Sequence, residues 1–220
     1  ICGDVGFGKT EVAIRTAFVV ASAGYQVALV APTTILVKQH YNSFLHRFKN
    51  SSMRVASLSR MTNNADRRSI KKDLISGDIN IIIGTHALLS NDVDFSNLGL
   101  LIIDEEQHFG VAQKEKIKEL QGNIHVLTLT ATPIPRTLQL SLSGIKKLSL
   151  ISTPPVNRLA VRTFVIEWDN VVLIDALKRE KRRGGQIFVV CPRIKDIDSL
   201  HDRIEKMVPD FSISVAHGQM

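Results

Sequence analysis

Apolar and polar positions along the chain alternate in a way typical of an α/β protein with a parallel sheet. Short apolar runs rich in β-branched residues, which favour buried strands, are separated by longer segments with apolar residues at helical spacing. In the first part of the chain the predicted strands are 26–31, 54–59, 79–84, 98–103, 125–130 and 147–151. The predicted helices are 12–23, 34–48, 65–76, 113–121 and one that follows Pro135 and ends near Ser143. The pattern predicts a parallel sheet with helices on both faces.

The same alternation begins again after Ser152-Thr153-Pro154-Pro155, where two prolines disfavour helix and central strand alike. The predicted elements that follow are strands 161–166, 186–190 and 212–216 and helices 170–183 and 196–207. We therefore predict a first lobe over 1–152, a linker over 153–157 and the start of a second lobe over 158–220. Because the chain begins with Ile and ends soon after its last predicted strand, we expect a fragment. Its first lobe should lack the first strand, and its second lobe should be truncated.

The chain opens on Gly3-Asp4-Val5-Gly6-Phe7-Gly8-Lys9-Thr10, which satisfies the phosphate-loop pattern G-x-x-x-x-G-K-T. Its glycines allow backbone N–H groups to turn toward phosphate oxygens at angles that a side chain would forbid. Lys9 is predicted to reach the β- and γ-phosphates, and the Thr10 hydroxyl to ligate Mg²⁺. The helix that follows directs its positive end toward the nucleotide. The loop predicts binding of a nucleotide with Mg²⁺.

An acidic pair, Asp104 and Glu105, follows the apolar run 100–103. Ligands of open parallel sheets bind beyond the carboxyl ends of the strands, so this pair should lie near the phosphate loop. Asp104 is predicted to hold Mg²⁺, usually through water, and Glu105 to orient and deprotonate the attacking water. Thr130 and Thr132 end the next strand, and their hydroxyls could hydrogen-bond the acidic pair.

Two other strand ends, at Thr33-Thr34 and at Thr85, place hydroxyls at predicted helix starts. Such positions suit contact with a phosphodiester backbone, and they equally suit plain N-capping by threonine, so both interpretations stay open. The net charge of +7 makes a polyanionic partner plausible, while the 5% aromatic content argues against a surface that stacks single-stranded bases.

The remaining composition narrows the class of protein further. Cys2 and Cys191 have no metal-ligand spacing, and so few cysteines suggest a reducing cytosol. No apolar run reaches the length that spans a membrane, and no signal peptide is visible. We therefore expect a cytoplasmic protein without a membrane partner.

Several segments, taken in order, resemble the motifs of a superfamily-two helicase motor. They are the loop 3–10, Ala31-Pro32-Thr33-Thr34, Gly84-Thr85-His86, Asp104-Glu105-Glu106-Gln107 and Thr130-Ala131-Thr132-Pro133-Ile134-Pro135-Arg136-Thr137. The last segment is similar to that of the bacterial duplex-DNA translocases. Phe7, the run Phe109-Gly110-Val111 and the terminal His217-Gly218-Gln219-Met220 look closer to the transcription-repair coupling factors than to the fork-remodelling DNA helicases.

This resemblance implies RecA-like lobes that use ATP and Mg²⁺ to move along duplex DNA. It implies that residues 3–10 bind ATP, that Lys9, Asp104 and Glu105 are catalytic, and that Thr10 and Asp104 hold Mg²⁺. Gln107 would be the last residue of the acidic motif 104–107, and Thr130 and Thr132 would couple hydrolysis to movement. Thr33, Thr34 and Thr85 would touch the DNA backbone. In a complete coupling factor, RNA polymerase and excision-repair proteins bind through modules that lie outside this sequence.

The sequence leaves two alternatives open. One is a fragment of a fork-remodelling ATP-dependent helicase, and the other is an inactive remnant of a split gene. The resemblance also implies that ATP lies between two lobes and that the second supplies an arginine. We therefore expect the 220-residue chain alone to hydrolyse ATP weakly.

Overall fold

The structure, a computed structural model, describes residues 1–131, 148–155 and 161–220. The chain divides into two compact units, residues 1–158 and 159–220. The helix predicted to end near Ser143 lies outside the described residues. Within them, no helix combines the length and the apolar character needed to cross a membrane.

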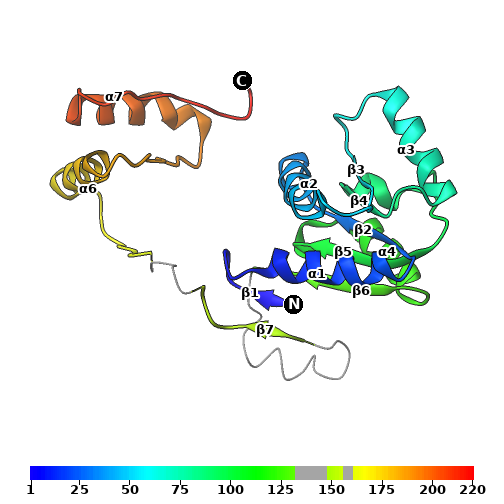
Figure 1. The fold of residues 1–220 in the computed structure, drawn as a ribbon. Helices are drawn as coiled ribbons and strands as arrows, with labels where there is room; N and C mark the ends of the chain where they lie inside the picture. Colours follow the sequence, from blue (N-terminus) through cyan, green and yellow to red (C-terminus); the bar gives the residue numbers. More distant parts are fainter. Residues whose placement is uncertain (132–147, 156–160) are drawn as a thin grey trace. The chain divides into compact units, whose positions relative to one another are not determined.

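Unit 1 is built on a five-stranded parallel sheet of order β3-β4-β2-β5-β6 (Figure 1). Its strands are β2 (Gln26–Val30), β3 (Val55–Leu58), β4 (Ile81–Gly84), β5 (Leu98–Asp104) and β6 (His125–Leu129). Each lies within a predicted strand or extends it by one residue, and the prediction of a parallel sheet is confirmed. All carboxyl ends therefore meet at one edge.

A two-residue strand, β1 (Cys2–Gly3), leads into the glycine-rich loop. It pairs in parallel with β7 (Leu150–Ile151) on one side, and Cys2 forms a parallel bridge with Thr130 on the other. These two residues stand where we expected the first strand of the lobe to be missing. Hydrogen bonds from both sides hold these two residues, with the Gly3 N–H donating to the Thr130 carbonyl at 3.2 Å.

Helices cover both faces of the sheet (Figure 1). α1 (Lys9–Ser22) and α2 (Thr34–Phe48) lie on one face, and α3 (Asn64–Ser76), the 3₁₀ helix η1 (His86–Leu89) and α4 (Val111–Gln121) lie on the other. Alternate strand positions separate the two cores: Val27 and Leu29 face α1 and α2, whereas Ala28 and Val30 face the opposite layer. Burial on both faces explains why these strands are continuous apolar runs.

Local signals set the helix ends. The Thr33 hydroxyl accepts from the Leu36 N–H at 3.3 Å and begins α2. The Asn63 side chain accepts from the Asp66 N–H at 2.8 Å and begins α3, which ends at Gly77 with φ +85°.

An exposed ion-pair group joins the first two helices. The hydrogen bond from Arg15 lowers the pKa of Glu11 on α1, and the charge of Arg47 on α2 lowers it further. Because Glu11 is solvent-exposed, this group contributes little to stability.

Unit 2 contains α6 (Asn170–Arg182), a 3₁₀ turn η3 (Ile194–Asp196) and α7 (Ile197–Met207) around a small core of Leu177, Ile204 and Val208. Its helices agree with the predicted ones. The strands predicted over 161–166, 186–190 and 212–216 are wrong for these described residues, which form no strand. An apolar run becomes a strand only where a neighbouring strand completes its hydrogen bonds.

Gly84 provides a test of how tightly the sheet is packed at the carboxyl ends of its strands. A Cβ atom here would lie 2.4 Å from the Leu58 carbonyl oxygen and 2.7 Å from Leu88 Cγ. Gly84→Ala should therefore lower the free energy of unfolding by about 1–3 kcal/mol, as overpacking of a rigid core does. Chemical denaturation measures this change. Gly122→Ala is the control, because its nearest neighbour would be the Glu119 carbonyl at 3.8 Å. Equal stability of the two variants would contradict the prediction.

Candidate nucleotide-binding site

The glycine-rich loop joins β1 to the first turn of α1. Gly6 and Gly8 have φ values of +78° and +89°, a left-handed conformation that side chains disfavour. Gly8 is the N-cap of α1 and supplies no side chain to the first-turn N–H groups of this helix. A Cβ atom at Gly8 would meet no atom within 4 Å. Uncapped N–H groups beside open space fit a phosphate group at the positive end of α1.

Lys9, the first residue of α1, closes the loop with its own side chain. Its ammonium group donates to the carbonyl oxygens of Gly3 at 2.6 Å and Asp4 at 3.1 Å. The Asp4 carboxylate accepts from the Val5 N–H at 2.7 Å, and the Asp4 carbonyl accepts from the Phe7 N–H. These bonds keep the cation within the loop. Thr10 follows in the same helical turn and is half-buried.

Asp104 ends β5 and is 8% exposed. Its Oδ2 atom lies 2.8 Å from Nε2 of His40, which comes from α2 and is equally buried. A carboxylate oxygen is a ligand that Mg²⁺ prefers, so this position fits the predicted metal role. The sequence reasoning missed His40. Its signal was available, because a histidine stands among the apolar residues of the buried face of α2.

Glu105 has φ +53°, the one left-handed conformation of a non-glycine residue among those described. Sparsely populated backbone conformations of this kind concentrate at functional sites. Its backbone N–H donates to the Leu129 carbonyl at 2.9 Å, and its side-chain Oε1 accepts from the Ala131 N–H at 3.1 Å. Gln107 donates its amide N–H to Glu105 Oε2. The carboxylate is thus held from both sides.

A continuous set of hydrogen bonds connects the loop to the acidic pair. The Thr130 carbonyl accepts from Gly3, at the start of the loop, and the next residue, Ala131, donates to Glu105. The Ala131 backbone N–H thus connects the end of β6 to Glu105, and the predicted bond from the Thr130 hydroxyl stays a prediction. Thr132, the second predicted partner, lies outside the described residues.

The three threonines considered for DNA contact all lie at the same edge of the sheet. Thr33 is exposed and its hydroxyl caps α2, and Thr34 is the half-buried first residue of that helix. Thr85 is only 4% exposed and its hydroxyl accepts from the Ala87 N–H at 3.5 Å, at the start of η1. Capping, one of the two interpretations open from the sequence, is therefore observed at Thr33 and Thr85. The burial of Thr85 leaves its hydroxyl little access to a ligand.

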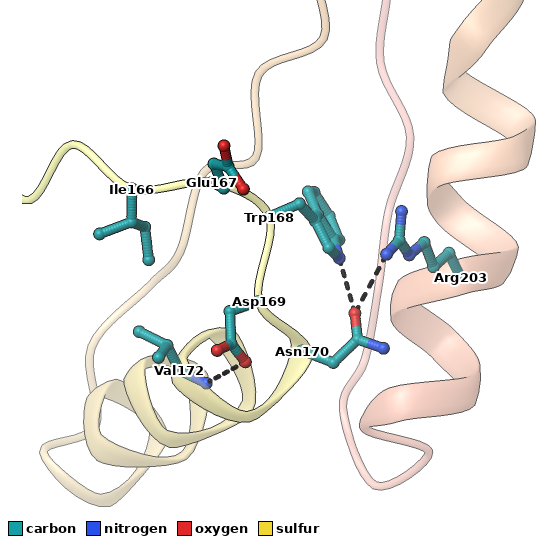
Figure 2. Close-up of a pocket in the computed structure, with 7 residues that line it drawn as sticks. All are labelled: Ile166, Glu167, Trp168, Asp169, Asn170, Val172 and Arg203. Atoms are coloured by element: carbon teal, nitrogen blue, oxygen red, sulfur yellow. Dashed lines mark hydrogen bonds between the residues drawn. The ribbon is translucent and has the colours of Figure 1, made fainter.

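A cavity of about 510 Å³ lies in unit 2 (Figure 2). None of the residues that line it is a predicted site residue. The Asn170 side-chain oxygen accepts from Trp168 Nε1 at 2.6 Å and from the Arg203 guanidinium at 3.1 Å. The guanidinium also lies over the Trp168 ring, 4.1 Å from its centroid. These bonds tie the start of α6 to α7, which is a structural role.

A model of the DEAD/DEAH box helicase family matches residues 1–141. The chain belongs to the DEAD/DEAH box helicase family. Membership in this helicase family implies the use of ATP, usually with Mg²⁺, and the loop and acidic pair have residues of the kinds that such a ligand requires.

Curated relatives and a solved structure agree with this assignment. The chain is 54% identical over 224 residues to the transcription-repair-coupling factor of Rickettsia prowazekii and 49% identical over 220 residues to that of Escherichia coli. All of the chain is matched, but it spans only about a fifth of these relatives' length. The structure of RecG bound to a three-way DNA junction matches with a TM-score of 0.77 at 36% identity, covering 94% of this chain and 28% of that one. These matches confirm the predicted RecA-like α/β fold and the resemblance to coupling factors.

Proposed function

We propose that this chain is the nucleotide-binding part of an ATP-driven motor that moves along duplex DNA, in a cytoplasmic protein of transcription-coupled repair. The observation that carries the proposal is the shared edge of the parallel sheet. The glycine-rich loop, Asp104, Glu105 and the end of β6 lie at the carboxyl ends of the strands and are joined by hydrogen bonds. The identity to coupling factors supports the DNA-repair context.

In this proposal the ATP phosphates are surrounded by the loop residues Gly3, Asp4, Val5, Gly6, Phe7 and Gly8. Lys9 gives up its contacts with the two carbonyl oxygens and donates to phosphate oxygens instead. Thr10 and Asp104 hold Mg²⁺, which supplies charge neutralisation to the phosphates. Glu105 accepts a proton from the attacking water, with Gln107 and the Ala131 N–H fixing its carboxylate. Thr130 and Thr132 connect this site to the following segment.

The proposed contact with the DNA backbone is supported by the N-terminus of α2. Thr33 is exposed, and backbone N–H groups at a helix N-terminus bind phosphate without reading the base sequence. Thr34 is the second candidate there. Thr85 supports the neighbouring turn through its capping bond. RNA polymerase and excision-repair proteins are proposed partners of the longer protein, through parts outside this chain.

The test uses what we call the extended protein, this chain with flanking sequence to the length of its coupling-factor relatives. RNA polymerase is halted on duplex DNA by omission of one nucleotide, and release of the transcript is measured. We expect release that requires both ATP and Glu105, so that Glu105→Gln releases nothing. ATP-dependent duplex binding without any release would contradict the polymerase-displacing role.

The match to RecG favours one alternative, a fork-remodelling DNA helicase. The same extended protein would then convert a model replication fork to a four-way junction in the presence of ATP and would leave halted RNA polymerase in place. The higher identity to coupling factors, 49–54% against 36%, favours the first proposal.

A further inference from the structure

The buried face of α2 carries one polar side chain in an otherwise apolar stripe. The buried residues of this helix are Val37, His40, Phe44 and Phe48, whose spacing of three or four places them on one face. The three apolar members pack in the core between α2 and the sheet, and His40 is only 6% exposed. An imidazole in such a position costs free energy unless its nitrogens are hydrogen-bonded.

His40 makes its hydrogen bond to the candidate Mg²⁺ ligand. Its Nε2 atom lies 2.8 Å from Asp104 Oδ2, and both side chains are buried. A carboxylate only accepts, so Nε2 carries the proton of this bond. The bond therefore restricts the rotation of the Asp104 side chain at the end of β5.

The second ring nitrogen, Nδ1, is buried and has no hydrogen-bond partner among the described residues. If the position required packing alone, a leucine would fill a similar volume without an unsatisfied polar atom. An imidazole bonded through one nitrogen departs from the rules of core packing, and such departures are expected at functional sites. The bond that accounts for the departure is the one to Asp104.

We propose that His40 is a positioning residue of the magnesium site, which holds the Asp104 carboxylate in the orientation that binds Mg²⁺. This inference rests on the proposed function, because the role of Asp104 toward Mg²⁺ is part of it. Side chains that hydrogen-bond a metal ligand typically change metal affinity or activity by about 10- to 100-fold when they are removed. His40 acts through Asp104 and is not itself a ligand.

The test compares nucleotide affinity with and without Mg²⁺ in the extended protein, by titration with a fluorescent ATP analogue. The measured quantity is the ratio of the two affinities. His40→Leu keeps the volume and removes the donor, and it should lower this ratio by about 10- to 100-fold while leaving Mg²⁺-free binding unchanged. His40→Gln, whose amide can donate from near the Nε2 position, should restore most of the ratio.

Phe44→Leu is the matched control. It alters packing on the same helix face without touching Asp104, so its ratio should equal that of the wild type. His40→Asn has the amide of His40→Gln on a shorter side chain that cannot reach Asp104, and it gives the same comparison if His40→Leu does not fold.

Two results would overturn the inference while nucleotide binding itself stands. One is an affinity ratio equal to that of the wild type in both His40→Leu and His40→Asn. The other is a decrease of the ratio in Phe44→Leu as large as the decrease in His40→Leu. A wild-type protein whose nucleotide binding does not respond to Mg²⁺ would instead overturn the proposed function, and this inference with it.

Discussion

Glu105→Gln in the extended protein should bind ATP with wild-type affinity and lose about 10²- to 10⁴-fold in turnover, the usual contribution of a positioned general base. The amide is isosteric with the carboxylate and keeps an oxygen that can accept from the Ala131 N–H. The Gln107 amide can rotate to present its oxygen to the new NH₂ group. The fold and the loop should therefore be preserved, and only the base is lost. DNA-stimulated phosphate release at saturating ATP measures the effect.

Glu115→Gln, on the exposed surface of α4, is the matched control and should retain full turnover. Wild-type turnover in Glu105→Gln would show that another group accepts the proton of the attacking water. A loss of ATP affinity in this variant would instead assign Glu105 to the structure of the binding site.

Lys9→Ala should lose most of its affinity for ATP. The Lys9 ammonium is held inside the loop by two carbonyl oxygens, within reach of a phosphate placed at the start of α1. Hydrogen bonds to charged groups contribute about 1.5–3 kcal/mol, which corresponds to a loss of about 10- to 150-fold in affinity. Equilibrium titration with an ATP analogue measures it.

Lys49→Ala provides the control for charge. Lys49 is the C-cap of α2, and its replacement removes the same unit of positive charge. It should bind ATP as the wild type does. An unchanged affinity in Lys9→Ala would mean that the backbone N–H groups of the loop bind the phosphates without help from the lysine.

Much of unit 1 could be predicted from the sequence because its signals are local. The run of apolar residues in β2 is buried on both faces, and helix α2 begins at Thr34, where the predicted helix begins. Gly77, the residue that follows the last residue of α3, ends this helix in the left-handed conformation that glycine commonly adopts there. Such features depend on residues that are neighbours in the chain, so a single sequence contains them.

The strands of unit 2 could not be predicted in the same way. The runs around Phe164 and Phe188 have the composition of buried strands, yet both side chains are largely exposed, at 74% and 89%. Strand formation requires a partner that lies elsewhere in the chain, and composition does not report whether that partner is in place. The backbone hydrogen bonds of α6 and α7 form within each helix, so these helices could be predicted from local sequence.

For the site, the sequence by itself determined which residue types follow which strands: a lysine and threonine after a glycine-rich turn, and two carboxylates after β5. Parallel strands then bring these groups to one edge, which follows from topology. Only the tertiary structure decided the bonds between distant segments. His40 meets Asp104 across 64 positions, and the Ala131 N–H reaches Glu105 across 26. Sequence spacing leaves such contacts open, because they are set by the packing of a helix on a sheet and by the register of adjacent strands.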